Sequence, residues 1–274
     1  MIRRDIPEHE YHADRTSLSQ SGAKILLDEG PAAFRWQQDH PRVSDAFDFG
    51  HAAHKHVLGV GAEIVVHEYD TAKVKSPRAT SAWKEQQAEV RERGGILLLP
   101  DEWAVVEAMA TKLREHTTAM RLLAEGEPEV SIYAEDSATG VLRRGRVDWL
   151  HPTMCVDYKT TAGTVHPKAL AGRYGTVRRF HYDQQVAWYL DLLRDHGHPA
   201  EDFAFIFQSK TAPYDVTVAL VPESELYEAR DRNAEALRIF AACTASGEWP
   251  GPVRPDSWAV LSLDRPTYTE EYAA

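Results

Sequence analysis

The sequence feature that most constrains the fold is a pair of short apolar-and-charged runs, VLRRGRVDWL and MCVDYKTT, between residues 141 and 161. The three residues that separate the runs include Pro152, and with a small polar neighbour it suits a tight reversal of the chain. The stretch therefore predicts two antiparallel strands joined by a short turn.

Each predicted strand carries charged side chains on one face, because alternate residues of a strand point the same way. Arg144, Arg146 and Asp148 share a face of the first strand, and Asp157 and Lys159 share a face of the second. If the two faces coincide, carboxylates and an ammonium meet at the end of the sheet. Clustered carboxylates persist mainly when a cation holds them together, and oxygen ligands favour Mg²⁺, Mn²⁺ or Ca²⁺. A hairpin with a solvated charged face explains the same residues and stays open as an alternative.

The spacing of these residues resembles the signature of the PD-(D/E)XK metal-dependent nucleases, with Asp148, eight residues, and then Asp157-Tyr158-Lys159. More narrowly, the stretch resembles the RecE/exonuclease VIII branch, found in phages and prophages, where a strand of the form tGv..kgRiD precedes one of the form vDyKTt. The corresponding segments here are TGV, RGRVD and VDYKTT. The resemblance implies an α/β (α+β) fold with a central mixed sheet flanked by helices.

The resemblance extends well beyond the hairpin, from about Ser17 to Trp249. We therefore expect a single nuclease domain over residues 1–274. It would carry a helical elaboration at about 71–125 and a loosely packed tail at about 252–274. The periodicity of apolar residues predicts the main helices, at about 17–30 with a stop at Gly30-Pro31, 101–125, 182–196, and 223–245 with Ser224 as its cap.

Composition limits the class of protein. A chain of 274 residues with 43% hydrophobic content can bury one sizeable core, and no apolar run approaches the roughly 18 residues of a membrane span. The N-terminus has no apolar signal region, and two cysteines fit a reducing compartment, so we expect a cytoplasmic protein. The net charge of −11 argues against non-specific coating of DNA, but it leaves room for basic residues that line one channel.

The resemblance also implies metal ligands upstream of the hairpin. Three histidines lie close together at His51, His54 and His56, and the motif histidine of RecE-like proteins falls on His54. The glutamate of their E-v-s motif falls on Glu129. A Mg²⁺ ion, for which Mn²⁺ can substitute, would then be held by His54, Glu129, Asp148, Asp157 and the Tyr158 carbonyl. A zinc site built on the three histidines remains an alternative.

The remaining candidate residues would act on water or on DNA. By resemblance, Lys159 orients the attacking water. Lys159, Asp148 and Asp157 are therefore the expected catalytic residues, and Gln185 is expected to assist them. The Y..Q...Y motif of these nucleases falls on Tyr182, Gln185 and Tyr189, with Gln185 supporting Lys159 or the substrate phosphate and Tyr189 packing against DNA. Arginine binds phosphate bidentately. The DNA-binding candidates are therefore Arg144, Arg146, Tyr189, Arg178 and Arg179, the last two on a basic loop over the site.

For function, the resemblance implies a Mg-dependent exodeoxyribonuclease that digests linear double-stranded DNA from the 5′ end and leaves 3′ single strands. It further implies a homo-oligomeric ring around DNA and a RecT-type annealing protein as partner, with no membrane association. Two alternatives stay open. One is a RecB-like DNA-repair or single-strand nuclease, and the other is a non-catalytic DNA-binding module on the same fold.

Overall fold

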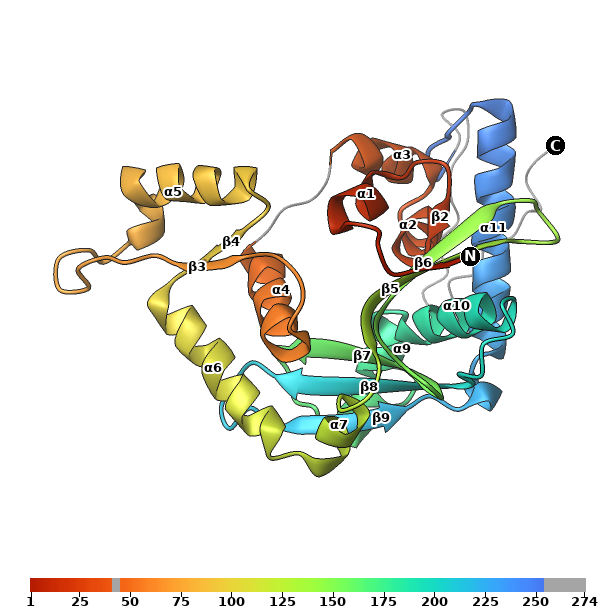
Figure 1. The fold of residues 1–274 in the computed structure, drawn as a ribbon. Helices are drawn as coiled ribbons and strands as arrows, with labels where there is room; N and C mark the ends of the chain where they lie inside the picture. Colours follow the sequence, from red (N-terminus) through yellow and green to blue (C-terminus); the bar gives the residue numbers. More distant parts are fainter. Residues whose placement is uncertain (41–44, 254–274) are drawn as a thin grey trace.

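A seven-stranded mixed sheet forms the centre of the computed structural model, which describes residues 1–40 and 45–253 (Figure 1). The strands run in the order β1 (Ile2–Arg3), β5 (Glu127–Glu135), β6 (Leu142–His151), β7 (Met154–Thr161), β8 (Asp202–Ser209) and β9 (Val216–Leu220), and β2 (Leu18–Ser19) pairs with β6. The β7–β8 and β2–β6 pairs are parallel and the other pairs are antiparallel. The predicted hairpin is confirmed as β6 and β7.

Helices cover both faces of this sheet. The first face packs against α2 (Gln20–Asp28), α3 (Pro31–Asp39), α10 (Tyr182–Arg194) and α11 (Tyr227–Ser246). The second face packs against α4 (Asp45–Leu58), α6 (Pro100–Arg114) and α7 (Thr117–Leu122). The expected fold class, a central mixed sheet flanked by helices, is confirmed.

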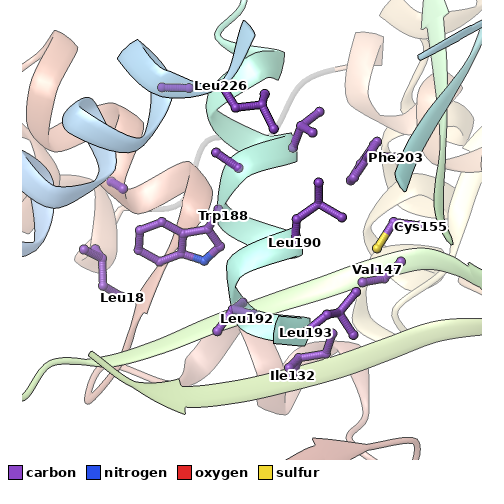
Figure 2. Packing of buried hydrophobic residues seen from close by; sticks show 14 of the residues in the cluster. Leu18, Ile132, Val147, Cys155, Trp188, Leu190, Leu192, Leu193, Phe203 and Leu226 are labelled. Atoms are coloured by element: carbon purple, nitrogen blue, oxygen red, sulfur yellow. The ribbon is translucent and has the colours of Figure 1, made fainter. Parts of the chain in front are cut away.

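The central strand β8 shows how the sequence produces two covered faces. Its aromatic residues Phe203, Phe205 and Phe207 belong to the core on the α10 side, whereas Ala204 and Ile206 belong to the core on the α4 side. A strand that is buried on both faces reads as a continuous apolar run, as this one does. On the first side, Figure 2 shows α10 laying its apolar side chains between strands of the sheet and neighbouring helices.

A smaller unit projects from the sheet, at the left of Figure 1. It contains the parallel pair β3 (Ile64–Val66) and β4 (Ile96–Leu98), with α5 (Ser81–Glu92) packed on it through a separate small core that includes Trp83. The remaining short elements are α1 (Glu8–Ala13), η1 (Pro77–Ala79), α8 (Pro167–Leu170), α9 (Thr176–Arg179) and η2 (Glu223–Glu225).

The structure adds a helix directly after one predicted helix and divides another predicted helix into two. The Gly30-Pro31 pair not only stops α2 but also opens α3, because Gly30 has a φ of +91° and a proline at the first helical position gives up no needed N–H donor. The helix predicted over 101–125 breaks after α6. His116 starts α7, accepting a hydrogen bond from the Ala119 N–H at 3.2 Å.

The prediction that Ser224 caps the last long helix is wrong. Ser224 lies in the short 3₁₀ turn η2, and α11 begins only at Tyr227. The other end agrees with the sequence, since Gly247 closes α11 with a φ of +73°. No helix in residues 1–40 or 45–253 is long and apolar enough to cross a membrane. The predicted tail lies outside the described residues from residue 254 onward.

Candidate active site

Three carboxylates occupy matching positions on three neighbouring strands. The antiparallel register of β5 and β6 sets Glu129 opposite Asp148. The pairing of β6 with β7 ends at Trp149 and Val156, and the next position along would set Asp148 against Asp157. Like charges directly opposite one another destabilise a sheet. The row is therefore tolerable only if cations lie close to it, and the structure supplies three of them.

The backbone is unusual where this row begins. Glu129 has a φ of +56°, in the left-handed region that residues with a Cβ seldom adopt. The Arg146 side chain holds the displaced carboxylate through a hydrogen bond from its Nε to Glu129 Oε2. A second arginine nitrogen, Nη1, donates to the Ile6 carbonyl at 3.0 Å. Arg146 is thus a fixed counterion of Glu129 at the edge of the site.

His54 supplies the second cation, from the α4 side. Its Nε2 lies 3.1 Å from Asp148 Oδ2 and its Nδ1 lies 3.6 Å from Glu129 Oε1. Burial lowers the pKa of His54, but the facing carboxylates, Asp148 first, outweigh burial and raise the pKa to about 9. The pKa of Asp148 is lowered despite its burial, because His54, Lys159 and the Tyr158 N–H stabilise its charged form.

Lys159 supplies the third cation, from the α10 side. Its Nζ lies 2.9 Å from Asp157 Oδ1 and 2.7 Å from Oδ2. Gln185 Nε2 donates to Asp157 Oδ1 at 2.5 Å. Burial and the neighbouring Asp148 raise the pKa of Asp157 to about 6, against the effects of Lys159 and Gln185. Burial lowers the pKa of Lys159, but Asp157 and Asp148 raise it overall, so the ammonium stays charged at neutral pH.

Tyr158 connects the two halves of the site. Its backbone N–H donates to Asp148 Oδ2 at 3.1 Å, across the point where β6 and β7 separate. Its hydroxyl donates to Gln208 Oε1 at 2.6 Å on the neighbouring strand. The side chain therefore fixes β7 against β8, while the backbone around it lies at the predicted metal site.

The donor chemistry of this row fits a hard divalent cation, since it offers three carboxylates, an imidazole and a backbone carbonyl. Asp157 Oδ2 is buried and lies 2.7 Å from the Lys159 ammonium, so a metal bound here would share this oxygen with the lysine. In the described part of the chain, however, no three His, Cys, Asp or Glu side chains are grouped so that they could hold a metal ion as they stand. Their present partners are protein cations instead.

The three histidines of α4 do not form a zinc site. His51 is exposed, His54 faces Asp148, and His56 packs edge-on against Trp103 with ring centroids 5.1 Å apart. The side chains therefore point to three different surroundings.

Arg144 has a different place from the one predicted. It is buried, and its Nη1 donates to the Ser17 carbonyl at 2.7 Å and to the Ser17 hydroxyl at 2.8 Å. Arg144 and Arg146 share a strand face as expected, and both guanidinium groups lie over the Tyr11 ring, at 5.2 and 5.5 Å. Arg144 thereby ties β6 to the N-terminal segment, and this placement gives no support to a DNA contact.

The other predicted DNA-binding residues differ in accessibility. Tyr189 packs against Gly145 of β6 and Phe203 of β8, so its ring is half-buried against the core. Arg178 donates to Asp183 Oδ2 at 2.6 Å and lies 3.4 Å from carboxylates of η2 and α11. Arg179 is exposed. Of these three side chains, Arg179 is the one that faces solvent without a carboxylate partner among the described residues.

Lys210 is a residue that the sequence analysis missed. It follows the last residue of β8, and its N–H donates to the Thr161 carbonyl at 2.7 Å, so it lies at the end of β7 that carries Lys159. Its Nζ lies 4.9 Å from the Phe49 ring of α4, and burial lowers its pKa. The available signal was positional, because a lysine directly after a strand parallel to β7 must end near the site.

Comparison with known proteins agrees with this geometry. A crystal structure of a "Putative exonuclease" from Eubacterium rectale superposes with a TM-score of 0.66 and 17% identity over 90% of each chain, which shows a shared fold. The structure of SSO0001 matches with a TM-score of 0.32 and 16% identity over 76% of this chain and 88% of that chain, too low to support an argument. No curated protein matches in sequence. Residues 30–254 match the model of the PDDEXK-like domain of unknown function (DUF3799), and the chain therefore belongs to that family.

Proposed function

We propose that this protein is a nuclease that requires Mg²⁺, for which Mn²⁺ can substitute, and digests linear double-stranded DNA from the 5′ end, leaving 3′ single strands. One observation carries the proposal. Glu129, Asp148 and Asp157 lie in register across three strands, and Lys159 is bonded to the last of them. Metal ligands beside a fixed cation suit the metal-assisted hydrolysis of a phosphodiester.

The metal would be held by His54, Glu129, Asp148, Asp157 and the Tyr158 carbonyl. A divalent cation bound there supplies charge neutralisation at the phosphate and a more acidic water. For these ligands to serve, His54 must lose the proton that Asp148 and Glu129 now stabilise. Arg146 remains bonded to one oxygen of Glu129 and so fixes the orientation of this carboxylate.

Lys159 would contribute a positive charge rather than a base. Because Asp157 and Asp148 raise its pKa, the ammonium keeps its protons at neutral pH and can donate to the attacking water and to the phosphate oxygen on which charge develops. Gln185 holds Asp157 from the other side and so fixes the position of Lys159 through their shared oxygen. The Tyr182 ring, 5.3 Å from Nζ, limits the access of water to the ammonium.

We further propose, on the resemblance of the motifs, that the protein acts on DNA ends as a homo-oligomeric ring and supplies single strands to a RecT-type annealing protein in homologous recombination. Light scattering after size exclusion, with and without linear duplex DNA, tests the ring. A monomer under both conditions would contradict it.

Digestion of linear duplex DNA tests the proposed activity. The duplex is labelled separately at each 5′ and 3′ end and incubated with Mg²⁺, Mn²⁺ or EDTA. We expect loss of the 5′ label as mononucleotides with either metal and no loss with EDTA. Asp157→Asn should abolish digestion. A matched control is Asp202→Asn, since Asp202 is an exposed aspartate at the opposite end of the same parallel strand pair and should be dispensable.

The other outcomes discriminate between functions. Digestion of single strands only would replace the proposal with a single-strand nuclease. Binding of DNA without hydrolysis under any divalent metal would favour a non-catalytic module on the same fold.

A further inference from the structure

Two aromatic side chains stand exposed on the segment that leads from β7 to α10. Tyr174 is 86% exposed and Phe180 is 41% exposed. Each ring has an arginine beside it, with the guanidinium carbon of Arg173 5.8 Å from the Tyr174 ring and that of Arg179 5.3 Å from the Phe180 ring. An exposed aromatic ring with a basic neighbour offers a face on which a nucleic-acid base can stack.

Phe180 is connected to the candidate active site through one further ring. It stacks on Tyr182, with centroids 5.8 Å apart and an interplanar angle of 28°. Tyr182 in turn contacts the lysine of the site, because the Nζ of Lys159 lies over the Tyr182 ring, 5.3 Å from its centroid. Lys24 of α2 holds the backbone at this point by donating to the Phe180 carbonyl at 3.0 Å. A group that stacks on Phe180 would thus lie one ring away from the catalytic lysine.

The charge around these rings favours an anionic ligand. Residues 166–182 contain Lys168, Arg173, Arg178 and Arg179 but no aspartate or glutamate, in a chain with a net charge of −11. Of the two neighbouring arginines, Arg178 forms an ion pair with Asp183, whereas Arg179 is exposed. The segment therefore combines flat apolar faces with free positive charge.

We propose that Tyr174 and Phe180 form a stacking platform for unpaired bases of the DNA strand that enters or leaves the candidate active site. This inference deepens the proposed nuclease function and rests on it. Every base has a face that stacks on an aromatic ring, and basic neighbours hold the phosphates of the same strand. In a duplex the faces are covered by neighbouring base pairs, so the platform binds single strands and frayed ends in preference to paired DNA.

Binding of short oligonucleotides tests the platform without any need for hydrolysis. The probe is a fluorescein-labelled single-stranded thymidine 12-mer in EDTA, followed by anisotropy, and a blunt duplex of the same length is measured alongside. The variants are Tyr174→Leu, Phe180→Leu and Phe180→Trp, all at exposed positions. Tyr227→Leu is the matched control, because Tyr227 is 75% exposed but lies among the glutamates of η2 and α11.

We expect Tyr174→Leu and Phe180→Leu each to weaken binding of the single strand about tenfold, which corresponds to the loss of one stacked base. Phe180→Trp should restore binding, and Tyr227→Leu should leave it unchanged. Binding of the blunt duplex should change much less than binding of the single strand.

Three results would overturn the platform. The first is an unchanged affinity for the single strand in both Tyr174→Leu and Phe180→Leu. The second is a loss of affinity in Tyr227→Leu as large as in these variants. The third is an equal loss of affinity for duplex and single strand, which would indicate phosphate contacts alone. An oligonucleotide carrying 2-aminopurine gives a second readout, because stacking quenches its fluorescence and the leucine variants should lose that quenching. Since both assays run in EDTA, a protein that stacks bases but digests no DNA would retain this inference and lose the proposed function.

Discussion

The two halves of the candidate site are closed to different degrees. On the α10 side, Asp157 is 1% exposed, and Lys159 and Gln185 donate to the same carboxylate oxygen. On the α4 side, the side chains of His54 and Asp148 each remain 20% exposed, and they are joined by one close contact. The α10 half is a buried ion pair that Gln185 also holds, whereas the α4 half is a partly exposed set of ion pairs around His54.

In the proposed mechanism the two halves have different tasks. Buried hydrogen bonds fix a charge in position before the substrate arrives, which is what a lysine that stabilises developing charge requires. Ligands of an exchangeable metal must instead accept a new partner, and a histidine paired with carboxylates can do so by giving up a proton. We therefore expect changes in the α10 half to cost both stability and rate, and changes in the α4 half to alter pH dependence.

The largest effect should come from Lys159→Met. Removal of this preorganised charge should lower the rate of DNA digestion by roughly 10²–10³. The same change leaves Asp157 buried without its cation, which should lower the free energy of unfolding by about 3–5 kcal/mol. Single-turnover digestion and urea unfolding at pH 8 measure the two effects.

A double variant separates stability from activity. Lys159→Met combined with Asp157→Asn removes both charges, so it should recover most of the stability that the single variant loses, while the protein stays inactive. If the double variant is as unstable as Lys159→Met alone, the pair is not the buried ion pair described above.

The next largest effect concerns His54 and depends on pH. Because its pKa is raised to about 9 in the folded protein from an ordinary 6.5, His54 contributes stability that is fully present below pH 6.5 and is lost as the pH rises through 9. The contribution is on the order of 3 kcal/mol. Urea unfolding of wild type and His54→Gln should therefore differ by about this amount at pH 6 and converge above pH 9.

The comparison between variants is needed because Asp157 also makes the free energy of unfolding depend on pH, in a lower pH range. Its pKa of about 6 lies above the ordinary value, so its folded state loses stability as the pH rises from about 4 to 6. Both proteins contain Asp157, so its contribution cancels when the unfolding free energy of His54→Gln is subtracted from that of wild type at each pH. A difference between wild type and His54→Gln that stays constant from pH 6 to 9.5 would contradict the charged state of His54.

A moderate effect should come from Gly145→Ala, which tests the contact on which the α10 half rests. A Cβ at Gly145 would lie 2.8 Å from side-chain atoms of Leu192 and Tyr189, so β6 approaches α10 too closely for any side chain. We expect a loss of about 1–3 kcal/mol in unfolding free energy. Gly163→Ala is the control, because the added carbon would meet only Thr161 Oγ1 at 3.6 Å.

The sequence predicted the α10 half better than the α4 half, and the reason is physical. The hairpin and α10 are long runs in which apolar and charged residues alternate with the period of a strand or a helix, so their faces follow from residue order alone. In contrast, the left-handed backbone at Glu129 and the end of β6–β7 pairing depend on contacts with Arg146 and Tyr158 that lie on other strands. No local pattern encodes them.

Long-range contacts also explain why Arg144 was assigned to DNA. An arginine four residues before a candidate catalytic aspartate is a reasonable phosphate ligand by residue type. The Ser17 carbonyl that accepts its hydrogen bond lies 127 residues away in the chain, directly before a two-residue strand that is too short to show a pattern. Residue type alone does not show which arginines are already held by protein groups in the folded structure.

Arg178 and Arg179 give the smallest expected effect and extend the same comparison to neighbouring residues. Arg178 is held by Asp183, so Arg178→Gln should lower the melting temperature and leave DNA affinity nearly unchanged. Arg179 is exposed, so Arg179→Gln should leave stability unchanged. If Arg179 contacts one phosphate, the slope of log affinity for duplex DNA against log salt concentration should become less steep by about 0.9 in this variant. Fluorescence anisotropy from 50 to 200 mM salt measures the slope. If Arg178→Gln alone alters the slope, DNA displaces the carboxylate partners of Arg178 when it binds. Arginines that are paired with carboxylates in the free protein would then also belong to the DNA-binding surface.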